Sequence, residues 1–213
     1  MHPELLVKAL AAMHGSATIE EFHAASGIAS RPVARRVVDF LLDHNIGSVR
    51  KGLLQFSSHD RLGVAAIALQ AGCDLEQVSQ HLSWKDFEGL ASEVLSSLGY
   101  ATQTNVRFTK PRMEVDVVGV DSGFALCIDC KHWKRSNLPS ISGFCVKQAA
   151  RTRELLKRDR SISEAVPAVM TLHAERVRFI ADIPIIPVLQ FRSFVMDVKG
   201  FLGHVQVIGR GSA

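Results

Sequence analysis

The sequence lacks the features of a membrane or secreted protein. No uncharged stretch approaches the roughly 18 residues that a membrane-spanning helix needs. The start, Met1-His-Pro-Glu4, lacks the basic residues and apolar core of a signal peptide. Without an export signal, the four cysteines are expected to be reduced thiols; they are Cys73, Cys127, Cys130 and Cys145. The sequence therefore predicts a soluble cytoplasmic protein.

Several classes of metal site and catalytic site also lack their signatures. Cys127 and Cys130 form a C-x-x-C pair, but no second Cys/His pair follows at the spacing of a zinc site. No serine or cysteine lies in the elbow motif of a hydrolase nucleophile. The formal net charge is only +4, which favours an anionic partner without identifying it. The cysteines are therefore interpreted as core thiols.

Residues 1–57 have the pattern of a small domain of their own. A first helix with an apolar face ends near Gly15, and Thr18–Glu21 resembles the capping box of a second helix. Ser30 is the expected cap of a third helix, and two short strands follow around Lys51-Gly52. This order of helices and hairpin is typical of a winged helix-turn-helix domain.

In a winged helix the third helix is the recognition helix. Its N-terminal half carries Arg31, Arg35 and Arg36, and Lys51 lies at the tip of the wing. Winged helices also mediate protein contacts, so the fold alone does not decide between DNA and a protein partner. Residues 58–83 are predicted to be a helical connector, and the second domain is predicted to span residues 84–213.

Charged residues interrupt two apolar runs that are predicted strands, 113–119 and 124–131. They are Glu114, Asp116, Asp129 and Lys131. Because side chains at i and i+2 share a strand face, Asp129 and Lys131 point the same way, and Glu114 and Asp116 emerge together. A turn signal at residues 121–123 predicts a hairpin that brings the two charged pairs side by side. Buried charges need partners, so this arrangement suits a divalent cation and an anionic substrate.

The rest of the second domain has an α/β pattern. An apolar stripe predicts a helix that ends at Gly99. The predicted strands lie at 100–108, 113–120, 124–131 and 166–172, with shorter ones at 183–188 and 204–208. A loop is predicted at 132–140 and helices at 141–158 and 191–198. The order predicts a central mixed sheet with helices around it.

The second domain resembles a known group of enzymes. The helix with Phe87-Glu88 and Leu98-Gly99-Tyr100, the Val-Asp116-Val-Val strand and the run Cys-Ile-Asp129-Cys-Lys131 are similar to the PD-(D/E)xK nuclease superfamily. Within it, Mrr-type restriction endonucleases and archaeal Holliday-junction resolvases are the most similar. The resemblance covers roughly residues 84–172. It implies an α/β restriction-endonuclease-like core with a central mixed sheet flanked by helices, preceded here by a small winged-helix-like α+β domain.

The resemblance also implies roles for individual residues. Asp116 matches the metal-binding aspartate, Asp129 the acidic member of the (D/E)xK pair, and Lys131 its lysine. Many relatives have Glu or Gln at the position of Asp129, and the shorter Asp reduces the reach to a metal. The family also uses a glutamate on the first helix. Glu88 flanks the apolar stripe whereas Glu93 lies further toward solvent, so Glu88 is the expected catalytic and metal-binding residue.

The residue types themselves suit metal-dependent phosphodiester hydrolysis. Mg²⁺, with Mn²⁺ as the alternative, binds carboxylates together with waters and a substrate phosphate. Asp116 and Asp129 supply carboxylates, and the carbonyl of Cys130 is a candidate for a further ligand. The ion activates a water, and Lys131 stabilises negative charge on the phosphoryl oxygens. Glu114 is either an accessory ligand or a partner for Arg112 or Lys131.

Basic residues follow these acids where a phosphate backbone would pass. Lys134 and Arg135 come directly after the second strand, and Lys147, Gln148 and Arg151 fit one face of the next helix. With Arg31, Arg35 and Arg36 they are the predicted nucleic-acid-binding residues.

These features predict a Mg²⁺-dependent endonuclease that hydrolyses DNA phosphodiester bonds, with a restriction-like or junction-resolving role. Resolvases of this type act as symmetric dimers, so a junction-cutting enzyme would be a homodimer. Two alternatives stay open. One is a non-cleaving DNA-binding or regulatory protein on a nuclease fold, and the other is a nuclease that acts on RNA.

Overall fold

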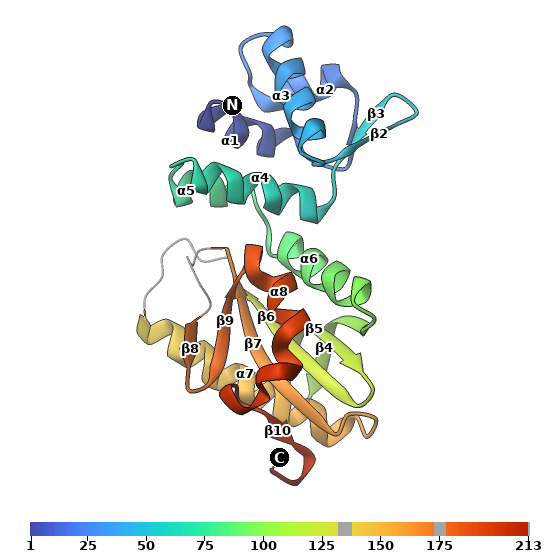
Figure 1. Ribbon diagram of the computed structural model, residues 1–213, viewed down its shortest axis with the longest axis vertical. Helices are drawn as coiled ribbons and strands as arrows, with labels where there is room; N and C mark the ends of the chain where they lie inside the picture. The colour runs from blue at the N-terminus through green and yellow to red at the C-terminus, as the bar shows by residue number, and fades with distance from the viewer. Residues whose placement is uncertain (132–137, 173–177, 213) are drawn as a thin grey trace. The chain divides into compact units, whose positions relative to one another are not determined.

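The computed structural model describes residues 1–131, 138–172 and 178–212. It divides into two compact units, Met1–Asp86 and Phe87–Ala213, each with its own buried apolar side chains (Figure 1). Within the described part of the chain, no helix has both the length and the apolar character needed to cross a membrane.

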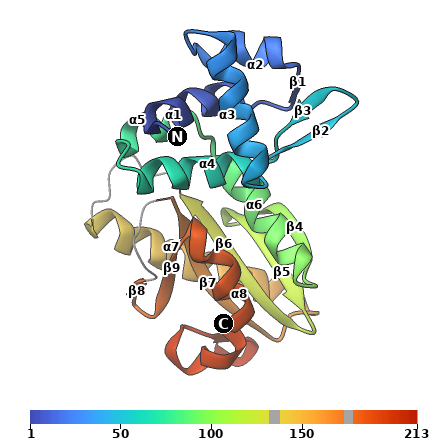
Figure 2. The same cartoon turned by 45° about the horizontal axis from the view of Figure 1, so that its top comes forward.

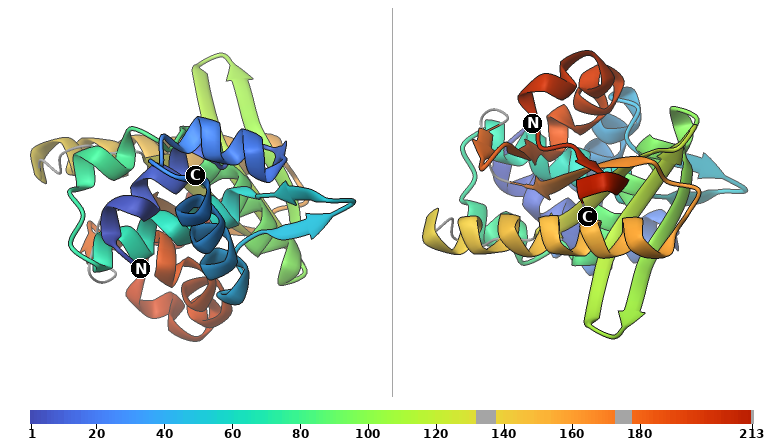
Figure 3. Two further views of the ribbon diagram at one scale, coloured as in Figure 1. Left: turned by 90° about the horizontal axis from the view of Figure 1, so that it is seen from above. Right: turned by 90° about the horizontal axis from the view of Figure 1, so that it is seen from below.

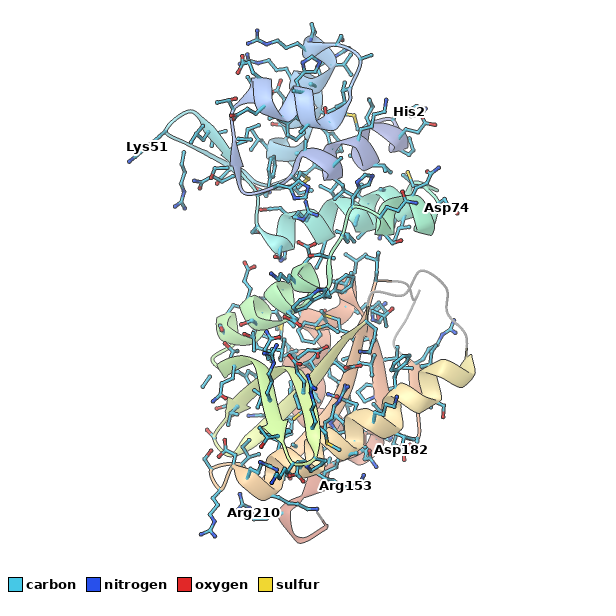
Figure 4. The ribbon with its side chains drawn as sticks, turned by 180° about the vertical axis from the view of Figure 1, so that it is seen from behind. His2, Lys51, Asp74, Arg153, Asp182 and Arg210 are labelled. Atoms are coloured by element: carbon cyan, nitrogen blue, oxygen red, sulfur yellow. The ribbon has the colours of Figure 1, made fainter. Side chains whose placement is uncertain are left out.

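The first unit begins with three helices and a three-stranded antiparallel sheet. The helices are α1 (Pro3–Ala12), α2 (Ile19–Ser26) and α3 (Arg31–Asp43), and the strands are β1 (Ser16–Ala17), β2 (Ser48–Arg50) and β3 (Leu53–Gln55) in the order β1-β3-β2. The β2–β3 hairpin projects from the side of the helices (Figure 2). Lys51 at its tip points away from them (Figure 4). The three helices and the hairpin follow the predicted order, whereas the short strand β1 between α1 and α2 was not predicted.

Local signals set the helix boundaries of this unit. Thr18 and Glu21 form the predicted capping box, in which Thr18 Oγ1 accepts a hydrogen bond from the N–H of Glu21 at 3.2 Å. Gly27 ends α2 at a φ of 61°, in the left-handed region that glycine adopts without a steric cost. Ser30 occupies the predicted N-cap position of α3, although its side chain makes no capping hydrogen bond. Pro32 in the first turn of α3 supplies a helical φ instead.

The segment predicted to be a connector is folded into the first unit. Its helices are α4 (Ser58–Gln70), which packs on α1, and α5 (Leu75–Ser79). Arg61 on α4 is 7% exposed, and its guanidinium donates to the carbonyl oxygens of Leu10 at 3.2 Å and Met13 at 2.5 Å. It also forms an ion pair with Asp86 at 2.9 Å. These contacts tie residues 58–86 to α1.

The second unit is built on a seven-stranded mixed sheet. The strands are β4 (Ala101–Thr109), β5 (Arg112–Asp121), β6 (Phe124–Lys131), β7 (Glu164–Thr171), β8 (Arg178–Ile180), β9 (Ile183–Pro187) and β10 (Ile208–Gly209). Their order is β4-β5-β6-β7-β9-β8, with β10 also paired to β7. The pairs β4–β5 and β5–β6 are antiparallel, whereas β6–β7 and β7–β9 are parallel. The predicted hairpin between residues 120 and 124 is therefore present.

Helices cover both faces of this sheet. They are α6 (Trp84–Ser97), α7 (Leu138–Arg158) and α8 (Phe191–Asp197). Val118 packs in the core cluster beneath α7, while an added Cβ on its neighbour Gly119 would lie 3.0 Å from the side chain of Leu95 on α6. Because successive side chains of a strand point to opposite faces, α6 and α7 lie on opposite sides of β5. Figure 3 shows α7 extending along its face of the sheet.

The predicted α/β architecture, a large mixed sheet flanked by helices, is confirmed. The predicted last strand, 204–208, is wrong. A 3-10 segment, Val198–His204, occupies its start, and pairing begins only at Ile208. Gly200 and Gly203 lie within that segment, where residues without a side chain favour turns over a strand. The short strand β8 had no counterpart among the predicted strands.

Candidate active site

Two carboxylates come together where strands β5 and β6 separate. The pairing of the two strands begins at Val117 and Ile128, so Asp116 and Asp129 are the next residues on either strand. The backbone N–H of Cys130 donates to Asp116 Oδ2 at 2.8 Å. The hairpin therefore brings the two acids together, as the sequence pattern predicts.

Asp129 is a buried carboxylate with two cationic partners. Its side chain is 0% exposed, and its Oδ1 accepts hydrogen bonds from Arg151 Nη1 at 2.6 Å and Lys131 Nζ at 2.9 Å. Lys131 Nζ also lies 2.9 Å from Oδ2, without the geometry of a hydrogen bond. Oδ2 is buried and has no hydrogen-bond partner among the described residues. Asp129 and Lys131 thus share a strand face, and each oxygen of Asp129 lies close to a cation.

The two carboxylates interact electrostatically. Burial raises the pKa of Asp116 above its usual range, and the neighbouring charge of Asp129 raises it further. The hydrogen bond from Cys130 and the charges of Lys131 and Arg151 act in the opposite direction. A cation placed between the carboxylates would relieve their repulsion.

Glu88 approaches this region from α6. Its side chain is 7% exposed, and Asn105 Nδ2 on β4 donates to Glu88 Oε2 at 3.3 Å. Burial raises the pKa of the Cys130 thiol well above its usual range, and the charges of Asp116, Asp129 and Glu88 contribute to that increase. Glu88 therefore lies near Cys130. Glu93 is exposed, so Glu88 is the helix acid that faces the interior.

Asn105 and Asp116 mark an interruption in the β4–β5 pairing. Thr104 pairs with Val117 and Val106 pairs with Val115, but residues 105 and 116 between them do not pair. Asn105 has a φ of 55°, in the left-handed region that asparagine tolerates better than most residues. The hydrogen bond from the Cys130 N–H holds the Asp116 carboxylate beside β6.

The donor set fits a hard divalent cation held by two carboxylates. Asp129 interacts electrostatically with a second acid, Asp116, and its Oδ2 makes no hydrogen bond to a described residue. The described residues contain no group of three or more His, Cys, Asp or Glu side chains arranged around a metal position. Remaining ligands would be water and substrate phosphate, which is common for Mg²⁺. Ligation by Glu88 and by the Cys130 carbonyl stays a prediction.

Helix α7 contributes to the site in a way that differs from the prediction. Lys147, Gln148 and Arg151 were expected on one nucleic-acid-binding face. Lys147 is exposed, but Gln148 is 0% exposed and donates from Nε2 to the carbonyl oxygen of Cys127 at 2.8 Å. Its predicted contact with nucleic acid is wrong, because the side chain points into the interface between α7 and β6. Arg151 reaches Asp129 instead of standing free on the helix.

The acids Glu114 and Asp116 do not act as a pair. Glu114 forms an ion pair with Arg107 across the β4–β5 hairpin at 3.2 Å, rather than with Arg112 or Lys131. Asp116 accepts from the backbone of Cys130 instead. A role of Glu114 as an accessory ligand stays a prediction.

The predicted nucleic-acid contacts of the first unit lie at or near the surface of α3. Arg31 pairs with Glu20. Arg35 and Arg36 are exposed, and neither forms an ion pair or a side-chain hydrogen bond within the described residues. Lys134 and Arg135 lie outside the described residues.

Comparisons with known proteins identify relatives but no activity. No family model matches the chain. An uncharacterized protein of Archaeoglobus fulgidus is 24% identical over 127 residues, which cover 58% of this chain and 97% of that protein.

Two solved structures are distantly similar. AF1548, a protein of unknown function, is 21% identical over 40% of this chain and 46% of its own, with a TM-score of 0.28. VC1899 from Vibrio cholerae is 13% identical over 95% of this chain and 52% of its own, with a TM-score of 0.36. The chain thus spans about half the length of each.

Two features of the site had no signal in the sequence. Arg151 is 22 residues from Asp129 along the chain, and nothing in their spacing predicts the contact. Arg107 and Arg112, which flank the tip of the β4–β5 hairpin, line a cavity together with Arg151 and were not among the predicted site residues.

Proposed function

We propose that this chain is a metal-dependent nuclease that hydrolyses DNA phosphodiester bonds on a restriction-endonuclease-like core. The observation that carries the proposal is the meeting of two acids, Asp116 and the fully buried Asp129, together with Lys131 where strands β5 and β6 separate. Neighbouring carboxylates repel each other. A cation held between them would offset that repulsion.

Asp116 and Asp129 are the side chains that would hold the ion. When bound, Mg²⁺ would polarise the scissile phosphate and lower the pKa of a water molecule. The N–H of Cys130 fixes one oxygen of Asp116, which leaves the other oxygen for the ion. Arg151 fixes Oδ1 of Asp129 in the same way, and Oδ2 lies 2.9 Å from the ammonium of Lys131.

Lys131 is the group placed to stabilise the reaction. Its ammonium lies 2.9 Å from Asp129 and 5.2 Å from the centre of the Phe144 ring, so two contacts fix its position. Its side chain is 21% exposed, so a substrate can reach it. The N–H groups of its ammonium can donate to oxygens on which negative charge develops.

The first unit supports a role in DNA binding. Three helices followed by a hairpin are the order of a winged helix, and we propose that α3 is its recognition helix. Arg35 and Arg36 are exposed on α3 without ion pairs among the described residues, which leaves their charges available for phosphates.

The test is cleavage of labelled linear, supercoiled and four-way-junction DNA with Mg²⁺, Mn²⁺ or EDTA. Metal-dependent cutting is expected, and Asp129→Asn and Lys131→Met should each lower the rate by about 10²–10³-fold. Asp121→Asn is the matched control, because Asp121 lies at the other end of β5 and pairs with Lys199 at the surface. Its rate should equal that of the wild type.

The alternatives predict different results in the same assay. Binding of DNA without cutting on any substrate, unchanged in Asp129→Asn, would leave a DNA-binding protein on a nuclease fold. Cutting of RNA in place of DNA would move the activity to another substrate. A preference for the four-way junction, with a dimer in solution, would support a resolvase role.

A further inference from the structure

A cationic cavity lies between the β4–β5 hairpin and α7. It has a volume of about 640 Å³, and its lining includes Arg107, Arg112, Glu114 and Arg151 with the apolar side chains of Phe108 and Met113. Figure 3 shows that the hairpin extends past the neighbouring strands. Three guanidinium groups therefore face one carboxylate around an open space.

The charges of the lining are only partly neutralised. Arg107 pairs with Glu114 at 3.2 Å, but the Arg107 side chain is 72% exposed, so this ion pair is weak. Arg112 is exposed and makes no side-chain hydrogen bond or ion pair within the described part of the chain. Arg151 Nη1 donates a hydrogen bond to Asp129 Oδ1 at 2.6 Å and another to Gln148 Oε1 at 3.5 Å. Since an arginine has five N–H donors, Arg151 retains others for a ligand.

The apolar part of the lining fixes the hairpin in place. Phe108 is 6% exposed in the core cluster under α7, and Met113 packs against the same cluster. The guanidinium of Arg158 on α7 lies 5.1 Å from the centre of the Phe108 ring. The arginines of the hairpin are therefore carried by a packed element, which lowers the entropic cost of binding a ligand.

We infer that this cavity binds a phosphodiester group of a DNA strand, beside the one at which the strand is cut. The inference rests on the proposed function. Phosphate oxygens match the forked donors of arginine, and contacts of this kind fix the register of a strand. Arg151 belongs both to the cavity and to the Asp129 site, so a strand held there is aligned with Asp116 and Asp129.

The test is DNA binding in EDTA at several salt concentrations, so that no cleavage is needed. The probe is a labelled duplex, with RNA of the same sequence in a parallel arm. Arg107→Gln combined with Arg112→Gln should lower affinity about 10-fold and reduce the slope of log affinity against log salt by about two. Arg160→Gln, an exposed arginine outside the cavity, is the control and should change neither. Both arginines of the double variant are exposed, so its melting temperature should match the wild type.

An affinity and a salt slope that are unchanged in the double variant would overturn the inference, as would a wild type that binds neither nucleic acid. Tighter binding of RNA, lost in the same variant, would overturn DNA as the ligand. Failure of the proposed function gives a different pattern. A wild type that binds DNA through these arginines but never cuts it supports the cavity and contradicts the nuclease. A wild type that cuts DNA, with DNA binding intact in the double variant, supports the nuclease and contradicts the cavity as a binding site.

Discussion

Each unit buries a carboxylate against an arginine, and the two pairs differ in how completely their hydrogen bonds are made. In the first unit, Arg61 and Asp86 are 2.9 Å apart, and the second oxygen of Asp86 accepts from the N–H of Ser83 at 2.7 Å and from its hydroxyl at 3.0 Å. In the second unit, Arg151 and Lys131 both donate to Oδ1 of Asp129, and Oδ2 has no hydrogen-bond partner within the described residues.

The difference separates a structural pair from a candidate site. A buried ion pair stabilises a fold only when its remaining donors and acceptors are satisfied. The network around Arg61 meets that condition, since its guanidinium also donates to three backbone carbonyls, those of Leu10, Met13 and His81. In the network around Asp129, Oδ2 has the ammonium of Lys131 at 2.9 Å but no hydrogen bond within the described residues. An incomplete buried network is expected where function, rather than stability, has set the residues.

The largest expected effect on stability comes from breaking the Arg61–Asp86 ion pair, whose hydrogen bonds are complete. Arg61→Met should lower the free energy of unfolding of the first unit by about 3–5 kcal/mol, because Asp86 and three carbonyl oxygens lose a buried partner. Chemical denaturation followed by circular dichroism measures this loss. Arg61→Lys should restore only part of it, since one ammonium cannot reproduce the planar fork. A wild-type midpoint in Arg61→Met would contradict a structural role.

The next effect concerns how α6 is seated on β5. Gly119→Ala adds a Cβ only 3.0 Å from the side chain of Leu95 on α6, so that side chain must give way, and we expect a loss of about 1–3 kcal/mol in the second unit. Because Glu88 lies on the same helix, DNA cleavage should fall as well. Leu95→Ala in the Gly119→Ala background removes the clash and should recover the cleavage rate. An unchanged denaturation midpoint in Gly119→Ala would show that the contact is not tight.

A smaller effect on stability is expected at Asp129, which pairs with Arg151 and Lys131. Asp129→Asn should change the free energy of unfolding by no more than about 1 kcal/mol, although Asp129 is fully buried. Its partners Lys131 and Arg151 are 21% and 23% exposed, so water can solvate them once the charge is gone. The same denaturation experiment measures this. A loss as large as that of Arg61→Met would make Asp129 a structural ion-pair residue and remove the contrast between the units.

The smallest expected effect is a pH dependence of the stability of the first unit. Burial lowers the pKa of His81, and the charges of Arg61 and His14 lower it further. The unfolded chain therefore binds a proton more readily than the folded one, so stability is complete above the usual histidine pKa and falls as the pH drops through it. His81→Gln should flatten the denaturation midpoint between pH 7 and pH 5. An equal decline in both proteins would assign the pH dependence to other groups.

The part of the site that lies within one hairpin was predictable. The i and i+2 spacing of Asp129 and Lys131, together with the turn at residues 121–123, places these side chains by strand geometry alone. The partners of Glu114 and Gln148 were not predictable. Glu114 pairs with Arg107 because the β4–β5 register places the two residues opposite each other. Gln148 is buried because α7 packs with that side chain toward the sheet. Helical periodicity alone did not identify its inward face.

Short-range order in this protein follows from its residues alone. The capping box at Thr18, the left-handed Gly27 and the charged strand positions depend on backbone dihedrals within a few residues. Tertiary structure decided which cation neutralises which acid. Arg151 meets Asp129 across 22 residues and Arg61 meets Asp86 across 25, because helices that pack on a sheet or on each other bring together side chains that no local spacing relates.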